Sequence, residues 1–198
     1  MKKVIIYGGA FNPPHVGHAI VIETAIRLFP ADEIWLMPSG DRRDKKIGVS
    51  SKHRINMIKL MVRDIFKNRP IPIKISSLEL ERVKLTTTYE TKIELEKTYP
   101  RHRFYFLIGS DIIDDIKSRW VNGKKLFESS NFLVFEKSSF PVSKNIGGKV
   151  TILSRSIEVN VTSTFIRKLI REGRSGLPYL TPSVAAYIKK HRLYKNKK

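Results

Sequence analysis

The chain has 198 residues, the size of one domain with a core large enough to organise a binding site. Lysine and arginine number 38 against 18 aspartates and glutamates, a formal net charge of +20, while the 41% of hydrophobic residues is too many for a disordered polycation. The absence of cysteine excludes disulfide scaffolds, thiolate metal sites and cysteine nucleophiles. We therefore expect a globular protein whose partner is a polyanion: nucleic acid, anionic lipid or a small phosphorylated ligand. No apolar run approaches membrane-spanning length, so we expect a cytoplasmic protein with no membrane partner.

Short β-rich runs alternate with helical patterns along the chain. Strands are predicted at 3–7, 33–37, 71–75, 102–108, 131–135 and 150–153, and helices at 17–29, 51–67, 88–97, 162–171 and 182–190. Pro72 marks the third strand as an edge strand. This alternation predicts an α/β, Rossmann-like fold with an open, mostly parallel sheet and helices on both faces. No repeat or linker divides residues 1–198, so we expect a single domain that ends in a helix and basic tail at about 182–198.

The first candidate site follows the first predicted strand. Its turn is formed by Gly8, Gly9, Ala10 and Phe11. The two glycines permit a sharp turn and the close approach of a ligand. His15 and His18 stand three residues apart where the next helix begins, so backbone N–H groups, the positive helix end and two imidazoles can bind an anion together. The alternative for these histidines is a helix cap and a packing residue. Two histidines without a nearby cysteine or carboxylate are a poor metal site, and no metal-binding residue is expected.

A second candidate site lies far downstream, at the start of a later helix. Ser163 and Thr164 stand at that start, and Arg167 follows one turn later. Hydroxyls and free N–H groups at a helix start, with an arginine beside them, bind phosphate oxygens well. Taken alone, the segment would more often be an ordinary helix cap with a surface arginine.

Together the two segments resemble the signature of a nucleotidyltransferase superfamily. His15-Val16-Gly17-His18 matches its (T/H)-x-G-H element, and residues 161–167 match its (I/V)-S-S-T-x-(I/L)-R element. Within that superfamily the chain is similar, nearly end to end, to bacterial nicotinate-nucleotide adenylyltransferases. The further shared segments are 86–91, Leu107 to Asp111, Trp120 and 179–194.

The resemblance implies an enzyme that joins ATP and nicotinate mononucleotide into deamido-NAD and pyrophosphate, with Mg²⁺ on the ATP. It places Gly109 and Asp111 at ATP, with Asp111 on the ribose, and Thr88 and Trp120 at the nicotinate ring. The phosphates would be held by His15, His18, Lys46 and Arg167, with the first turn, Ser163 and Thr164 as further ATP-binding groups. The expected partners are thus ATP and a pyridine mononucleotide.

Three departures from the family pattern leave alternatives open. The usual Pro-Pro-His-Lys segment is replaced by Arg42-Arg43-Asp44-Lys45-Lys46, in which Lys46 is the retained lysine. Thr87 and Val121 occupy two tyrosine positions where the pyridine ring should be recognised, so nicotinamide mononucleotide or another phosphorylated acceptor remains an alternative. A nucleic-acid-binding protein is the remote alternative. Because the basic residues are scattered outside the tail, we expect no specific nucleic-acid partner. The sequence does not decide between a monomer and a homo-oligomer.

Overall fold

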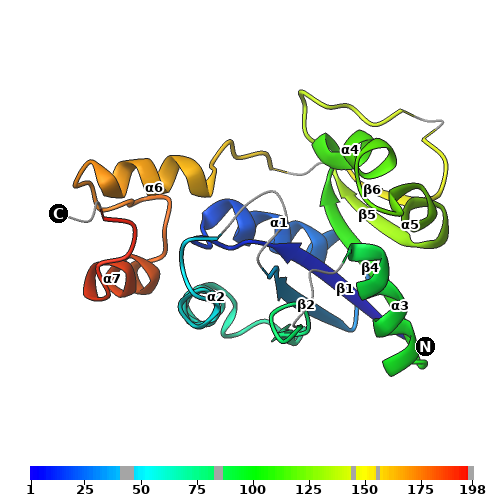
Figure 1. Cartoon of the computed structure of the whole chain (residues 1–198), viewed down its shortest axis with the longest axis horizontal. Helices are drawn as coiled ribbons and strands as arrows, with labels where there is room; N and C mark the ends of the chain where they lie inside the picture. Colours follow the sequence, from blue (N-terminus) through cyan, green and yellow to red (C-terminus); the bar gives the residue numbers. More distant parts are fainter. Residues whose placement is uncertain (41–46, 83–86, 144–145, 155–156, 196–198) are drawn as a thin grey trace.

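In the computed structural model, which describes residues 1–40, 47–82, 87–143, 146–154 and 157–195, a six-stranded sheet runs through the molecule (Figure 1). The strand order is β3-β2-β1-β4-β5-β6, and every neighbouring pair is parallel. The strands are β1 (Lys2–Gly9), β2 (Glu33–Pro38), β3 (Ile73–Ile75), β4 (His102–Gly109), β5 (Asn131–Phe135) and β6 (Lys149–Leu153). The predicted parallel α/β fold is confirmed.

Helices cover both faces of this sheet. They are α1 (Val16–Leu28), α2 (Ser51–Phe66), α3 (Thr88–Thr98), α4 (Ile113–Ser118), α5 (Gly123–Ser129), α6 (Ser163–Arg171) and α7 (Pro182–Lys190), with a short 3₁₀ helix at Ser110–Ile112. Helices α1, α2, α6 and α7 bury their apolar side chains in one core, and α3, α4 and α5 bury theirs in a second. Figure 1 shows α6 and α7 at one end of the molecule and α4 and α5 at the other.

Alternation within the strands explains the two cores. In β1, Ile5 belongs to the first core, whereas Val4 and Ile6 belong to the second. A strand buried on both faces needs apolar residues at consecutive positions, which is the pattern of a parallel sheet. Strand β3 begins directly after Pro72 and lies at the sheet edge, as its proline predicts.

The structure corrects the helices at two points. The sequence spacing predicts an apolar face of α2 through Ile55, Ile58, Val62 and Ile65. Ile58 is buried, but the buried stripe runs through Arg54, Met57 and Met61, and Ile65 is 41% exposed. Helix α5 is not among the predicted helices. It has only seven residues, too few to show a helical period, and it is fixed by the burial of Leu126 and Phe127.

A buried carboxylate ties together the amino ends of three strands. Glu33 is 2% exposed and accepts hydrogen bonds from Lys2 Nζ, from Lys74 Nζ at 2.9 Å and from Trp35 Nε1 at 2.6 Å. Burial alone would raise the pKa of Glu33, but these hydrogen bonds lower the pKa to about 2. The ionised carboxylate therefore stabilises the amino ends of these strands, opposite to the loops that follow their carboxyl ends.

The strand order predicts a ligand-binding crevice at the carboxyl ends of β1 and β4. The chain runs outward from β1 through β2 to β3, and outward from β4 through β5 to β6, so the order reverses between the two central strands. Ligands of open parallel sheets bind where the order reverses in this way.

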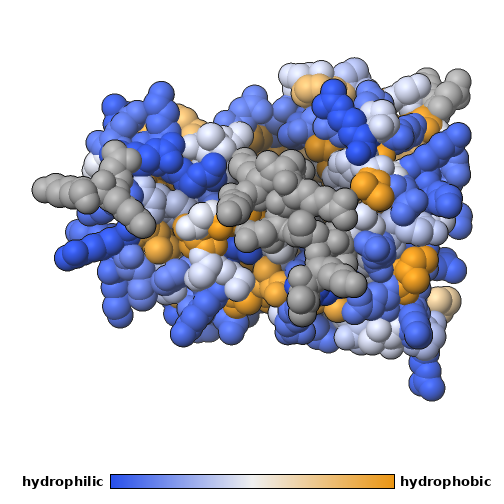
Figure 2. Space-filling model, viewed as in Figure 1, coloured by the Kyte–Doolittle hydropathy of each residue, from blue (hydrophilic) through white to orange (hydrophobic). Residues whose placement is uncertain are grey.

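No helix in the described part of the chain is long and apolar enough to cross a membrane. The face seen in Figure 2 is mostly hydrophilic, with smaller hydrophobic patches between the polar side chains.

Candidate active site

The loop after β1 turns at an aromatic residue rather than at its glycines. Gly8 and Gly9 end strand β1, and neither has a positive φ. The left-handed residue is Phe11, with φ of 46° and a side chain that is 1% exposed. The prediction that the glycines make the turn is therefore wrong. Their absent side chains still matter, because a Cβ on Gly8 would meet no atom within 4 Å, which leaves open space for a ligand.

His15 and His18 lie against each other at the start of α1. His15 is the N-cap residue and is 6% exposed, a position compatible with both the packing alternative and an anion site. The ring centroids of the two histidines are 3.9 Å apart. Gly17 makes this contact possible, because a Cβ there would lie 3.0 Å from both Cε1 and Nδ1 of His15.

Both imidazoles are neutral at pH 7. Burial lowers the pKa of His15 to about 4, and burial together with the neighbouring His15 lowers the pKa of His18 well below its ordinary value. The backbone N–H of His15 donates to Nδ1 of His18 at 3.2 Å, so the proton of neutral His18 is on Nε2. His18 is therefore a hydrogen-bond donor through Nε2 and carries no charge.

Side chains from two helices hold the carbonyl groups of the loop. Arg54 of α2, which is 2% exposed, donates to the carbonyl of Ala10 at 2.9 Å. In α6, Arg167 donates to the carbonyl of Asn12 at 2.7 Å, and Ser163 Oγ donates to that of Pro13 at 2.8 Å. Carbonyl oxygens that are bound in this way do not face an incoming anion. The two segments singled out in the sequence thus meet in space, although 150 positions separate Ser163 from Pro13.

Helix α6 begins as the sequence predicts. Thr162 is its N-cap, and its hydroxyl accepts a hydrogen bond from the N–H of Phe165 at 3.1 Å. Arg167 also donates to Thr164 Oγ1 at 3.0 Å. Ser163 and Thr164 therefore stand at a capped helix start that contacts the loop after β1, which is compatible with phosphate binding.

Asp111 forms the other side of the crevice, after β4. Its carboxylate pairs with Lys137 Nζ at 2.7 Å and does not cap α4, whose N-cap is Ile112. A Cβ on Gly109 would lie 2.3 Å from Asp111 Oδ1, so a larger residue there would displace this carboxylate. Tyr7 lies close to His18 and is also affected by the charge of Asp111. Its ring centroid is 6.1 Å from that of His18, and burial together with the charge of Asp111 raises its pKa.

Thr88 and Trp120 lie on the elements that cover the opposite face of the sheet. Thr88 is the first residue of α3, and Trp120 follows α4 and packs, partly buried, against the second core. Within the described residues, no hydrogen bond or ring contact joins either of them to the two histidines. Lys46 lies outside the described residues, so its predicted place beside the phosphates has no structural counterpart here.

Sequence reasoning missed four polar residues around the crevice: Tyr7, Arg54, Lys137 and Tyr194. Arg54 had a usable signal, because it shares a helical stripe with Met57, Ile58 and Met61, and an arginine on a buried face needs a specific partner. The others stand at strand ends or in loops, where no period marks them.

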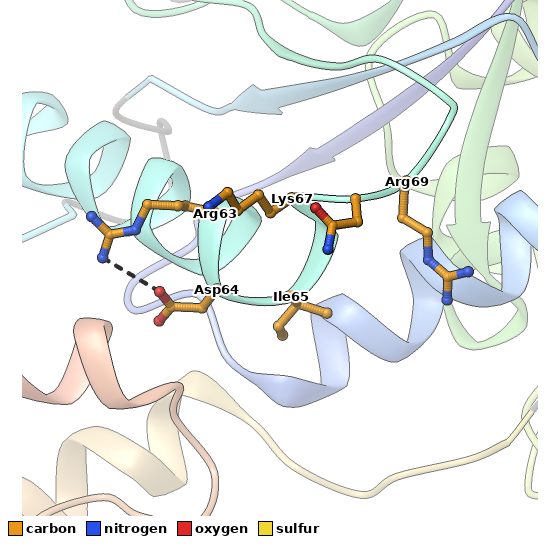
Figure 3. Close-up of a pocket in the computed structure, with 6 residues that line it drawn as sticks. Arg63, Asp64, Ile65, Lys67 and Arg69 are labelled. Atoms are coloured by element: carbon orange, nitrogen blue, oxygen red, sulfur yellow. Dashed lines mark hydrogen bonds and ion pairs between the residues drawn. The ribbon is translucent and has the colours of Figure 1, made fainter.

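A surface hollow elsewhere does not suit a phosphate ligand. Figure 3 shows it at the carboxyl end of α2, lined by Arg63, Asp64, Ile65, Lys67, Asn68 and Arg69. Two of its arginines are already paired, Arg63 with Asp64 at 3.4 Å and Arg69 with Glu23. The carboxyl end of a helix also carries partial negative charge. Among the residues that the structure describes, no group of three or more histidines or acidic residues is placed to hold a metal ion.

The family match and the similar curated proteins agree on the family of this chain. The cytidylyltransferase-like family matches residues 6–169. The chain is 31% identical to a probable nicotinate-nucleotide adenylyltransferase of Oceanobacillus iheyensis, over 98% of this chain and 97% of the relative. It is 32% identical to that of Halalkalibacterium halodurans, over 98% and 92% of the two chains.

Solved structures agree in fold. The nicotinic acid mononucleotide adenylyltransferase of Plasmodium falciparum, complexed with NaAD, has a TM-score of 0.82 and 27% identity over 98% of both chains. A putative nicotinate-nucleotide adenylyltransferase of Vibrio parahaemolyticus, at 23% identity and a TM-score of 0.73, shares the fold. Because the family match spans most of the chain and the curated relatives align along nearly all of it, the protein belongs to the cytidylyltransferase-like family and, within it, to the nicotinate-nucleotide adenylyltransferases.

Proposed function

We propose that this chain transfers the adenylyl group of ATP to nicotinate mononucleotide, giving deamido-NAD and pyrophosphate. The names of its relatives point to this acceptor. The observation that carries the proposal is the meeting of two helix starts, α1 with its two neutral histidines and α6 with its hydroxyls, at one loop beside the crevice. Two helix starts at one place give the partial positive charge that a polyphosphate chain needs.

The reaction requires no general base. An oxygen of the acceptor's phosphate, ionised at neutral pH, attacks the α-phosphorus of ATP. The bond from that phosphorus to the oxygen bridging to the β-phosphate breaks, and pyrophosphate leaves with the bonding electrons. The protein therefore has to align the two phosphates and stabilise the charge that develops on the α-phosphate oxygens.

His18 suits the α-phosphate. Its Nε2–H is a fixed donor, because Nδ1 accepts from the backbone of His15. A neutral donor in a buried site stabilises developing negative charge without first exchanging a proton with solvent. His15, in ring contact with His18, holds that imidazole in place and would donate beside it.

The β- and γ-phosphates would lie at the start of α6. Thr164 and Arg167 would supply donors there, beside Ser163, whose hydroxyl holds the carbonyl of Pro13, and Lys46 would add a charge from the segment after β2. Gly8, Gly9, Ala10 and Phe11 would line the approach of ATP. Mg²⁺ would enter with ATP as part of the substrate, held by phosphate oxygens and neutralising the leaving pyrophosphate.

The other side of the crevice suits the nucleosides. Asp111, beside Gly109, would accept hydrogen bonds from the ATP ribose, and Thr88 and Trp120 would hold the pyridine ring. A pyridinium ring can stack on Trp120 through a cation–π contact. Val121, which follows Trp120, is 58% exposed, and its side chain offers no hydrogen bond to the ring substituent. Comparing the rates with nicotinate and nicotinamide mononucleotide therefore tests which acceptor the site prefers.

The test is His18→Ala, with pyrophosphate release measured at saturating ATP, Mg²⁺ and nicotinate mononucleotide. We expect turnover to fall by at least about 100-fold, the effect of removing one preorganised donor from a transition state, with the thermal unfolding midpoint retained. His191→Ala is the matched control, because His191 is an exposed histidine that contacts Tyr187 and lies in no phosphate-binding loop. Near wild-type turnover by the His18 variant would remove His18 from the mechanism.

A further inference from the structure

The turn that follows α7 reaches back to the loop after β1. The hydroxyl of Tyr194 donates to Oδ1 of Asn12 at 2.6 Å, across 182 positions of sequence. Arg192 and Tyr194 have φ values of 50° and 64°, and the N–H of Leu193 donates to the carbonyl of Ile188 at 3.1 Å. The chain therefore bends sharply at the end of α7, and this bend aims the tyrosine at the loop.

Helix α7 is a firm base for this turn because α2 holds it at two places. Near its start, Ser183 donates to Asp64 through Oγ at 2.8 Å and through its backbone N–H at 3.2 Å. Farther along, Tyr187 OH lies 2.9 Å from Nδ1 of His53 and accepts from Asn56 Nδ2 at 3.1 Å. Helix α7 is thus anchored on α2 at two separate places, near its start and farther along.

Both oxygen atoms of Asn12, the backbone carbonyl oxygen and Oδ1, accept hydrogen bonds. Its carbonyl accepts from Arg167, and its side-chain oxygen accepts from Tyr194. It directly follows Phe11, whose left-handed φ of 46° is a costly conformation that surrounding contacts must maintain. Burial raises the pKa of Tyr194, although Arg167 and Arg54 pull it down in part, so the hydroxyl stays protonated and remains a donor at neutral pH.

We infer that Tyr194 is a positioning residue for adenylyl transfer, which holds the loop from Gly8 to His15 in its ATP-binding form through Asn12. The inference rests on the proposed function. Its consequence is that the turn after α7, which contributes nothing to the sheet, is part of the active site. Removal of the Tyr194 hydroxyl should lower kcat/KM for ATP and leave the unfolding midpoint unchanged.

The experiment compares two tyrosines of the same C-terminal region. Tyr194→Phe removes the hydrogen bond to the loop. Tyr187→Phe removes the hydrogen bonds of Tyr187 to α2, while those of Ser183 to Asp64 still hold α7 in place. We expect Tyr194→Phe to lower kcat/KM for ATP about tenfold, the upper range for one hydrogen bond, with KM for the pyridine mononucleotide and the unfolding midpoint unchanged. Tyr187→Phe should lower the unfolding midpoint and keep kcat/KM for ATP.

A double-mutant cycle with Asn12→Ala isolates the contact. In the Asn12→Ala background, Tyr194→Phe should cause no further loss. The inference is overturned if Tyr194→Phe matches the wild type, if its loss is as large without the asparagine side chain, or if Tyr187→Phe lowers kcat/KM equally. Should Tyr194→Phe fail to fold, Asn12→Ala alone severs the bond from the other side, and wild-type kinetics from it would overturn the inference.

The failure of the proposed function is a separate outcome. If the wild type releases no pyrophosphate with nicotinate mononucleotide, that function is wrong, and the wild type, the three single variants and the double variant are compared by calorimetric titration with ATP. About tenfold weaker ATP binding by Tyr194→Phe, absent in the Asn12→Ala background, would still support the positioning role. Equal affinities across the set would overturn it.

Discussion

Replacing Gly17 with alanine would place a methyl group against the ring of His15. The new Cβ would lie 3.0 Å from both Nδ1 and Cε1 of that ring, and 3.7 Å from the carbonyl oxygen of Val161. His15 is 6% exposed, and its ring centroid is 3.9 Å from that of His18. The ring must yield by a few tenths of an ångström, and because it lies against His18 we expect the substitution to disturb both histidines.

Stability and activity should respond differently to this change. Alanine is favoured over glycine in a helix by about 1 kcal/mol, which offsets a crowding cost of similar size, so the unfolding free energy should change by less than about 1 kcal/mol. Misplacement of reacting groups by about 1 Å can cost 100-fold in rate. For a shift of a few tenths of an ångström we expect kcat to fall about tenfold.

Two assays separate these effects. Pyrophosphate release at saturating substrates gives kcat, and urea denaturation gives the unfolding free energy. Gly48→Ala is the matched control, because a Cβ on Gly48 would meet nothing within 4 Å. Wild-type kcat for the Gly17 variant would refute the reasoning that the spacing of the two rings governs the reaction. A large loss of stability would refute the view that the crowding is local.

Two further predictions concern other parts of the molecule. Because the pKa of Glu33 is lowered from its ordinary 4.5 to about 2, its ionised form stabilises the fold above pH 4.5, and this contribution is lost as the pH falls toward 2. Glu33→Gln should therefore lower the unfolding free energy at pH 7, by at most about 3 kcal/mol because Lys2 and Lys74 are partly exposed and screened. The gap between the two proteins should shrink toward pH 2, and an equal gap at pH 7 and pH 2 would contradict the assignment. Trp120→Ala should raise KM for the pyridine mononucleotide about tenfold through the lost stacking, with KM for ATP unchanged. Equal rises in both constants would mean that Trp120 only supports the second core.

Much of the fold could be predicted because the strands are buried on both faces. Continuous apolar runs such as the one in β1 mark such strands without any knowledge of their neighbours, and the proline before β3 marks its edge position. The buried side of α2 could not be read in the same way. Its stripe contains Arg54, whose spacing with Met57 and Met61 signals a buried partner but does not show that this partner is the carbonyl of Ala10.

In the candidate site, too, residues in local motifs could be predicted and residues that depend on tertiary contacts could not. The sequence indicates the residues at helix starts, because His18 and Ser163 stand in recognisable motifs. The support behind the loop was hidden. The left-handed turn at Phe11 and the hydrogen bond from Tyr194 to Asn12 depend on contacts between distant segments, and single tyrosines after a helix carry no periodic signal. The sequence therefore points to the chemistry, and the structure adds what holds it in place.

The most direct test of the whole account is the release of pyrophosphate by the purified protein from ATP and Mg²⁺ with one acceptor at a time. Nicotinate mononucleotide, nicotinamide mononucleotide and phosphopantetheine are supplied in parallel, with an assay lacking acceptor as the control. The account predicts the highest kcat/KM with nicotinate mononucleotide and none above background with phosphopantetheine. Faster reaction with nicotinamide mononucleotide would contradict the assigned acceptor, and no release with either pyridine mononucleotide would contradict the proposed function itself.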